Sequence, residues 1–229
     1  MPPPSPDLPS FDGFVVRKVK RDGAVHKGRV SIAERDGVVC VVKDLGPMRP
    51  ILRRLYGRRN LAREARALER LADFPGTPRL LRRISKDAIA VEFVRTLHKY
   101  LRDKIPREQL PAILRSFEET VAALHARGFV HLDLRQRKNV LVPTADRVVL
   151  IDFESSRDLS GPIARRLLLP WLARIDRAAV RKWKVKLAPE ICSPEEIEAV
   201  ARYGRWKRVW PWKRLGRIVR RWFGDDVAR

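Results

Sequence analysis

The sequence predicts an α+β fold in which short strands come first and a mostly helical part follows. Short β-rich runs separated by turn signals occupy residues 11–94. The clearest helical periodicity, over 107–127, begins only after them. A length of 229 residues allows one large domain or two small lobes that share a cleft. A hydrophobic fraction of 45% is normal for a globular protein and excludes disorder of the whole chain.

The first strands follow a proline-rich stretch, residues 1–10, which we expect to be an extended arm. Apolar and basic residues mix over 14–20, and polar and apolar residues alternate over 30–32. Both patterns predict half-buried strands. Gly23 and Gly28 lie in the connection between them.

A third strand is predicted over 38–42, where a β-rich run follows an Asp-Gly hairpin signal and ends at Lys43. The next element is a helix over 61–71, because leucine and alanine recur there on one face. Glu64 lies beside that apolar stripe and follows Lys43 by 21 residues.

Two more strands, over 79–84 and 88–93, precede the long helix. Over 107–127, six apolar residues follow the 3.6-residue period, and Gly128 supplies a C-terminal stop. This helix leads the chain directly into its most informative stretch.

Residues 128–153 combine short apolar runs with polar groups at their ends. The runs, which predict short buried strands, are 129–130, 140–142 and 148–151. Asp133 is placed to take a proton from a hydroxyl group. Asn139 and Asp152 offer oxygen ligands to a hard cation such as Mg²⁺.

The pattern H-L-D-L-R-Q-R-K-N followed by I-D-F resembles the catalytic loop and the metal-binding turn of the protein-kinase-like superfamily. The resemblance covers about 140 of the 229 residues and fades after Phe153. It implies a two-lobed fold with a small antiparallel-sheet N-lobe and a truncated, mostly helical C-lobe. On this basis we expect an N-lobe over 11–94, a catalytic core over 95–160 and a basic helical region over 161–229.

The resemblance also implies catalytic roles. Asp133 would orient the acceptor hydroxyl and accept its proton, and Arg135 would stabilise charge on the transferred phosphoryl group. Asp152 and Asn139 would hold Mg²⁺. His131 is expected to anchor the loop rather than to react.

The same resemblance implies an ATP site. Lys43 would pair with the α- and β-phosphates, and Glu64 would hold Lys43 in place. Gly28 occupies the position of the last glycine in a phosphate-binding loop, although two ordinary hairpin glycines explain the pattern equally well. Backbone groups at Glu92 and Val94 would read the adenine edge.

Three departures from the family pattern bear on the site. Asn139 follows Asp133 by six residues rather than the usual five, so either the loop bulges or Gln136 takes the ligand role. Glu154 stands where the family has the glycine of D-F-G, which indicates a fixed rather than a toggling loop. An A-P-E sequence at 188–190 is interpreted as a coincidence.

The charge and the cysteines restrict partners and compartment. The formal net charge is +23, from 50 basic and 27 acidic residues, which favours a polyanionic partner: an anionic membrane surface, a phosphorylated glycolipid or a nucleic acid. A merely solvated basic surface is the alternative.

Cys40 and Cys192 lie far apart, which indicates reduced thiols in the cytoplasm. No run of 18 apolar residues and no signal-peptide pattern occurs, so we expect neither a membrane span nor secretion.

All six tryptophans lie at or after Trp171. Over 205–223, four of them and several aliphatic residues recur at helical spacing opposite arginine and lysine, and Pro211 should kink this helix. Such a helix is typical of a membrane interface with anionic lipid, unless its aromatic face packs on the helical lobe.

These observations predict an ATP-dependent kinase that acts on a hydroxyl of a lipopolysaccharide or lipid-linked sugar. The resemblance is to small bacterial Kdo/heptose kinases and RIO-like kinases. The net charge and the Trp-rich basic tail are the grounds for expecting a peripheral location on the inner face of the cytoplasmic membrane. Two alternatives stay open. One is a RIO-like Ser/Thr protein kinase, and the other is a non-catalytic kinase-shaped module that binds RNA or anionic lipid.

Overall fold

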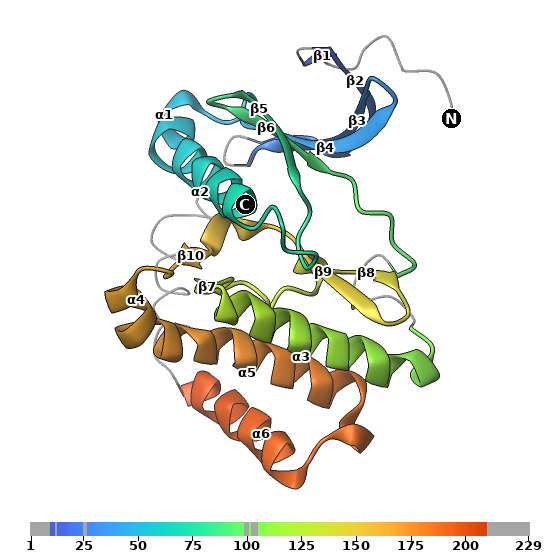
Figure 1. Ribbon diagram of the computed structural model, residues 1–229, viewed down its shortest axis with the longest axis vertical. Helices are drawn as coiled ribbons and strands as arrows, with labels where there is room; N and C mark the ends of the chain where they lie inside the picture. Colours follow the sequence, from blue (N-terminus) through green and yellow to red (C-terminus); the bar gives the residue numbers. More distant parts are fainter. Residues whose placement is uncertain (1–9, 12, 25–26, 99–100, 102–104, 210–229) are drawn as a thin grey trace. The chain divides into compact units, whose positions relative to one another are not determined.

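The computed structural model describes residues 10–11, 13–24, 27–98, 101 and 105–209. The chain divides into two compact units, Met1–Val180 and Arg181–Arg229. The fold class is α+β: a small antiparallel sheet near the N-terminus and helices after it (Figure 1). This arrangement is compatible with the expected two-lobed layout. Among the described helices, none is both long enough and apolar enough to span a bilayer.

Six antiparallel strands form the main sheet, in the order β1-β2-β3-β4-β6-β5 (Figure 1). Their bounds are β1 Ser10–Phe11, β2 Phe14–Arg21, β3 Arg29–Arg35, β4 Val38–Asp44, β5 Leu80–Ser85 and β6 Ala88–Glu92. The five strands predicted before residue 94 are confirmed, and β3 is longer than the predicted 30–32. β3 is longer because every one of its residues pairs with a residue of β4.

Mostly small and β-branched side chains, together with one phenylalanine, form a buried cluster on this sheet. The buried members of the cluster are Phe14, Val16, Ala33, Cys40, Val42 and Ala90. Burial raises the pKa of the Cys40 thiol, and both Cys40 and Cys192 are free cysteines. The prediction of unpaired thiols is therefore confirmed.

The helical segment between β4 and β5 begins earlier than predicted. It comprises α1 Pro50–Leu52, a π-helical turn Arg53–Gly57 and α2 Arg58–Arg70, in place of the predicted 61–71. The part before α2 lacks an apolar stripe. Asp87 contacts it through Arg53, at 3.8 Å, and forms a bidentate ion pair with Arg58, the first residue of α2, at 2.6 and 3.0 Å. Because Asp87 lies far along the chain, local periodicity gives no sign of this pair.

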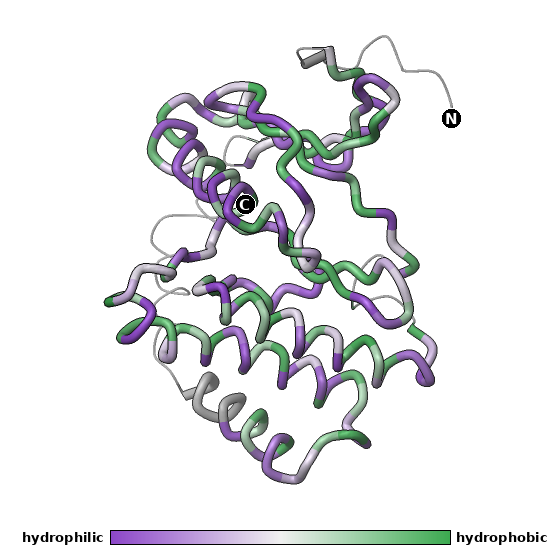
Figure 2. Tube along the Cα trace, viewed as in Figure 1, coloured by the Kyte–Doolittle hydropathy of each residue, from purple (hydrophilic) through white to green (hydrophobic). Residues whose placement is uncertain are grey.

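The long helix is confirmed as a 3₁₀ turn, Arg107–Gln109, followed by α3 Leu110–Ala126. Its buried residues are Leu110, Ile113, Leu114, Phe117, Val121 and Leu124. Hydrophobic and hydrophilic residues accordingly alternate along α3 in Figure 2. Gly128 ends the segment with φ +81°, and a Cβ there would lie 2.7 Å from the Cα of Ser160. Only glycine fits that position without strain.

Two small two-stranded antiparallel sheets follow α3. β7 Phe129–Val130 pairs with β10 Arg157–Asp158, and β8 Val140–Thr144 pairs with β9 Arg147–Leu150. The three strands predicted between 128 and 153 are thus confirmed. Between them lie 3₁₀ turns over Arg137–Asn139 and Phe153–Ser155.

The remaining helices are α4 Pro162–Leu167, α5 Leu169–Leu187 and α6 Pro194–Val209, with a 3₁₀ turn at Pro189–Ile191. α4 and α5 lie within the stretch that the sequence predicts to be basic and helical. The helix expected over 205–223 begins earlier, at Pro194, where Ser193 and Glu196 exchange hydrogen bonds of 3.1 and 3.3 Å in a capping box. The predicted kink at Pro211 lies outside the described residues.

Candidate active site

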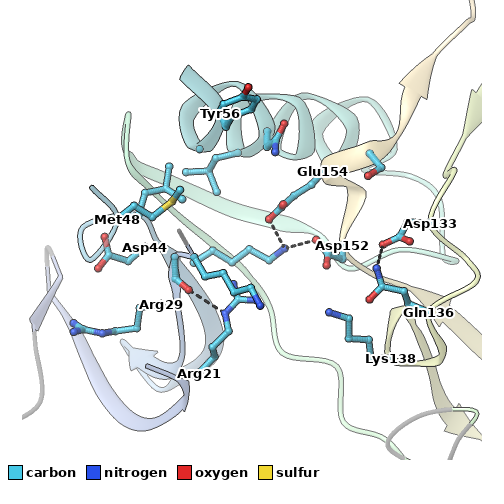
Figure 3. A pocket seen from close by; sticks show the side chains of 18 residues that line it. Arg21, Arg29, Asp44, Met48, Tyr56, Asp133, Gln136, Lys138, Asp152 and Glu154 are labelled. Carbon is cyan, nitrogen blue, oxygen red and sulfur yellow. Dashed lines mark hydrogen bonds and ion pairs between the residues drawn. The ribbon is translucent and has the colours of Figure 1, made fainter. Parts of the chain in front are cut away.

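A polar cleft of about 290 Å³ lies between the Lys43 end of the sheet, α2 and the two turns around Asp133 and Asp152 (Figure 3). Five residues to which the sequence assigned a binding or catalytic role line it: Gly28, Lys43, Asp133, Gln136 and Asp152. They come from the residue before β3 and from β4 on one side, and from two turns more than 80 residues later on the other. The fold therefore brings these distant positions together.

Lys43 is the electrostatic centre of the cleft. Its Nζ donates to both carboxylate oxygens of Glu64, at 2.7 and 2.6 Å, and to Oδ1 of Asp152, at 3.2 Å. Glu154 lies 3.9 Å away, and Figure 3 shows Glu154 and Asp152 converging on this amine. Burial by itself lowers the pKa of Lys43, but the three carboxylates outweigh burial and raise it. Lys43 is therefore a permanently charged ammonium.

The pKa values of two carboxylates that bond to Lys43, Glu64 and Asp152, shift in opposite directions. Burial raises the pKa of Glu64, with Lys43 opposing that effect. Burial also acts to raise the pKa of Asp152, but Lys43, and to a smaller extent Lys138, lower it overall. Asp152 therefore stays ionised, as a cation ligand must.

Local structure fixes both ends of this ion-pair network. Lys43 is the penultimate residue of β4 and is paired on either side, with Val30 and Ile89. Asp152 follows β9 in the left-handed region, with φ 70° and ψ 64°, a conformation that aspartate tolerates better than most residues. The next side chain, Phe153, is fully buried.

His131 anchors the turn that carries Asp133. Its Nε2 lies 3.0 Å from the carbonyl oxygen of Ile151, and its ring contacts the ring of Phe153, with 4.7 Å between centroids. Burial lowers the pKa of His131, so the imidazole is neutral. These contacts agree with the anchoring role expected for His131.

Asp176 on α5 fixes the backbone of this turn by hydrogen bonds, and sequence analysis did not identify it. Its buried carboxylate accepts the backbone N–H groups of His131, at 2.7 Å, and of Leu132, at 2.8 Å. The ring of His125 lies 3.1 Å from the same carboxylate. The available signal was that Asp176 is the only acidic residue of a 19-residue basic helix. A lone carboxylate on a helix face that packs inward indicates a buried hydrogen-bond acceptor.

Two side-chain amides orient Asp133. Its Oδ2 accepts the side-chain N–H groups of Gln136, at 2.7 Å, and of Asn139, at 2.9 Å. Asn139 also donates to the backbone oxygen of Asp133, at 3.0 Å. The six-residue spacing is accommodated by the 3₁₀ turn ending at Asn139. Of the two proposed amide ligands, Gln136 lines the cleft and Asn139 is buried beside Asp133.

Among the cations of the loop that carries Asp133, Lys138 rather than Arg135 lines the cleft. Lys138 lines the cleft, and its charge lowers the pKa of Asp152, whereas Arg135 is not among the lining residues. The loop R-Q-R-K offers three cations, and the turn at Arg137–Asn139 decides which of them faces Asp152. Such a turn cannot be read from spacing alone.

The expected adenine-reading residues lie elsewhere. Glu92 ends β6, where its backbone N–H donates to Arg79 at 2.9 Å and its carboxylate accepts the Arg79 N–H at 3.0 Å. Neither Glu92 nor Val94 lines the cleft. Gly28 does line it, but a Cβ there would lie 2.8 Å from the Asp44 carbonyl oxygen. Close packing of backbones therefore accounts for this glycine without any phosphate.

Sequence analysis did not assign Arg21 or Arg29 to the site, and it gave Glu154 no ligand role. Arg21, Lys27 and Arg29 line the cleft from the β2–β3 connection and its flanks. Glu64, Asp152 and Glu154 place oxygen atoms within 4.8 Å of one another, a donor set that suits a hard divalent cation. Positive charge for a polyphosphate and carboxylates for its cation are thus present together.

Comparison with known proteins adds no assignment: neither a family model nor a curated protein matches the chain.

Proposed function

We propose that the protein is an ATP- and Mg²⁺-dependent phosphotransferase that moves the γ-phosphoryl group to a hydroxyl. The observation that carries the proposal is the convergence of Lys43, Asp133 and Asp152 on one cleft, with Lys43 Nζ 3.2 Å from Asp152. Phosphoryl transfer needs cations around the phosphates, a carboxylate for the metal and a carboxylate for the acceptor. These three residues supply one of each.

The cations of the cleft would bind and orient the triphosphate. Lys43 is held by Glu64 through two short hydrogen bonds, so its ammonium keeps one position and one charge state. Arg21, Arg29 and Lys138 add positive charge along the lining. Such preorganised charge lowers the barrier because it need not rearrange as charge develops on the phosphoryl oxygens.

Asp133 would act on the acceptor. Its Oδ2 is occupied by the amides of Gln136 and Asn139, which fixes the plane of the carboxylate. The acceptor hydroxyl would then meet Oδ1, to which its proton passes. Asp133 lies in the same cleft as Lys43, so the donor phosphate and the hydroxyl share one space.

The donor set fits Mg²⁺, because Asp152 and Glu154 present carboxylates to the cleft. Gln136 or Asn139 would complete the protein's share of the ligands. When bound, Mg²⁺ would neutralise charge on the phosphate oxygens. Glu154 can serve as a ligand because a side chain stands here in place of the family's glycine, and its carboxylate lies 3.9 Å from the Lys43 ammonium.

The proposal is tested by transfer of label from γ-labelled ATP to glycolipid or protein acceptors. Asp133→Ala should lower the turnover number by about 10²-fold or more, the usual share of a general base. Asp146→Ala is the matched control, because Asp146 is exposed and bonds only to Thr144 among the described residues. Equal turnover in the two variants, or no turnover in the wild type with any acceptor, would overturn the assignment.

A membrane-borne acceptor is favoured by an exposed apolar patch at the junction of α4 and α5. Ile163, Leu167 and Trp171 are 75, 66 and 63% exposed. The segment 161–175 has three arginines and no acidic residue. Apolar side chains beside uncompensated arginines are typical of surfaces that enter anionic lipid. We therefore propose a lipid-linked saccharide as acceptor, reached from the membrane surface.

Vesicle sedimentation tests this part separately. Leu167→Ala/Trp171→Ala should weaken binding to anionic vesicles, while Leu97→Ala, at a position 57% exposed but outside the patch, should not. Binding to RNA without binding to vesicles would contradict the membrane proposal and favour the nucleic-acid alternative.

The other readings make different predictions. A RIO-like Ser/Thr protein kinase would leave phosphoserine or phosphothreonine on itself or on a protein acceptor and would not label glycolipid. A non-catalytic module would bind vesicles or RNA with no transfer of label. The intact set of Lys43, Asp133 and Asp152 favours the catalytic readings over this one.

A further inference from the structure

A second cavity, of about 370 Å³, lies between α2 and the segment that enters β10. Four of its lining residues are arginines: Arg63, Arg66 and Arg70 on α2, and Arg157 at the start of β10. We call it the arginine cavity. None of these four arginines lines the active-site cleft.

The cavity follows from a stripe in the sequence of α2. Arginines at 59, 63, 66 and 70 recur every three or four residues, so they share one face of the helix. The apolar residues Leu61, Ala65 and Leu68 occupy another face and are buried. The arginines are thereby gathered at one surface, and the last three of them line the cavity.

The positive charge of this cavity is only partly balanced. Its two acidic residues are already engaged: Asp158 pairs with Arg70 at 3.1 Å, and Glu69 pairs with Arg83 outside the cavity, at 2.6 and 2.8 Å. In the described part of the chain, no carboxylate lies within 4.0 Å of Arg63.

The same holds for the other two arginines. Among the described residues, neither Arg66 nor Arg157 has an ion-pair partner. Arg66 donates to the carbonyl of Ala62 in its own helix, and Arg157 donates to two backbone carbonyls. Burial first, and then the charges of Arg157 and Arg66, lower the pKa of Arg63. The Arg63 guanidinium is therefore repelled by those of Arg66 and Arg157 at this cavity, although Glu69 also attracts Arg66.

We propose that the arginine cavity binds a phosphate dianion, either free or as the monoester group of a small molecule. A dianion would offset the mutual repulsion of Arg63, Arg66 and Arg157. Guanidinium groups suit this ligand because their paired N–H donors match two phosphate oxygens. A neutral or cationic ligand would leave the charge of the cavity uncompensated.

Two of these arginines also hold the turn that follows Asp152. Arg63 donates to the carbonyl of Glu154 at 2.7 Å, and Arg157 donates to those of Ser155 and Ser156, at 3.0 and 2.8 Å. An anion in the cavity would therefore contact the groups that position this turn. Any resulting effect on phosphoryl transfer rests on the proposed function, but the binding itself does not.

The test is calorimetric titration of the full chain with inorganic phosphate at constant ionic strength, with chloride as reference. Arg66→Gln should raise the dissociation constant about tenfold or more, since a charged hydrogen-bond donor is lost. Arg66 is the suitable site because its hydrogen bond lies within its own helix, where glutamine is equally helical. Arg115→Gln, exposed on α3, removes the same charge elsewhere and should change the constant less than twofold.

Lys138→Gln distinguishes binding of phosphate in the active-site cleft from binding in the arginine cavity, because this variant removes an exposed cation of the cleft lining. The proposal expects unchanged phosphate affinity in this variant. A loss in Lys138→Gln without a loss in Arg66→Gln would place the anion in the cleft and overturn the proposal, as would absence of binding in the wild type. Parallel titrations with a hexose phosphate and with phosphatidic acid vesicles distinguish a soluble monoester from a lipid headgroup. None of these titrations contains ATP, so a failure of the proposed function leaves them unaffected.

Discussion

Replacing Asp176 with asparagine tests the contact that holds the Asp133 turn on α5. The carboxylate accepts two backbone N–H groups, from His131 and Leu132, at 2.7 and 2.8 Å, in a fully buried position. An asparagine of the same shape offers a single acceptor oxygen. Its amino group must face the second N–H, so that one buried donor is left unsatisfied.

The cost follows from that count. An unsatisfied buried N–H costs about 1–3 kcal/mol, and a hydrogen bond to a charged group contributes about 1.5–3 kcal/mol. Because the two effects overlap, we expect Asp176→Asn to lower the free energy of unfolding by about 2–4 kcal/mol. At about 2–4 °C per kcal/mol for a chain of this size, the melting temperature should fall by about 4–16 °C.

Thermal unfolding followed by circular dichroism measures this change. Asp73→Asn is the control, because Asp73 is 78% exposed and its ion pair with Arg127 is long, at 3.5 Å. Such an exposed pair contributes at most about 1 kcal/mol. If Asp176→Asn and Asp73→Asn melt within about 1 °C of each other, the account of Asp176 as the anchor of the turn is wrong.

Three further predictions follow from the site. Burial lowers the pKa of His131 below its ordinary 6.5, so on acidification the unfolded chain binds a proton at this histidine before the folded chain does. The contribution of His131 to the free energy of unfolding is therefore complete above pH 6.5 and should decrease as the pH falls. His131→Asn should reduce the slope of the free energy of unfolding against pH. Gly28→Ala would place a Cβ 2.8 Å from the Asp44 carbonyl and should cost about 1–3 kcal/mol in urea unfolding. Lys138→Ala should lower the turnover number by on the order of 10²-fold, and Arg135→Ala by much less, because only Lys138 lines the cleft.

Each of these predictions has a result that contradicts it. A stability profile between pH 5 and 7 that is the same in His131→Asn would remove the histidine from the account. Gly161→Ala, where a Cβ meets nothing within 4 Å, is the control for Gly28→Ala, and equal stability of the two would refute the close packing. Equal losses of turnover in Arg135→Ala and Lys138→Ala would refute the conclusion that Lys138 is the loop cation in the cleft.

Local patterns predicted those parts of the fold that local forces decide. Period-2 runs with turn signals located the strands of the sheet, and 3.6-residue spacing located α3, because burial of one face dictates both patterns. The start of the helical segment at Pro50 was missed because Asp87, from another hairpin, holds it. The capping box at Ser193 was visible in the sequence and would have placed the start of α6.

Some residues of the candidate site could likewise be found from the sequence, whereas others depend on contacts between distant parts of the chain. The sequence pattern and its family resemblance identified Lys43, Asp133 and Asp152, which the structure brings into one cleft. Asp176 could not be assigned from spacing, because its partners lie 44 and 45 residues away and are backbone groups. Lys138 was missed because a single 3₁₀ turn decides which loop cation faces the carboxylates.

The most direct test of the central claim is calorimetric titration with ATP in the presence of Mg²⁺. Lys43 and Asp152 form one ion-paired unit in the cleft, so we predict that the wild type binds the nucleotide and that Asp152→Asn binds it at least tenfold more weakly only when Mg²⁺ is present. Binding that is equal in the two proteins with Mg²⁺, or no binding by the wild type, would contradict the assignment of this cleft to phosphoryl transfer.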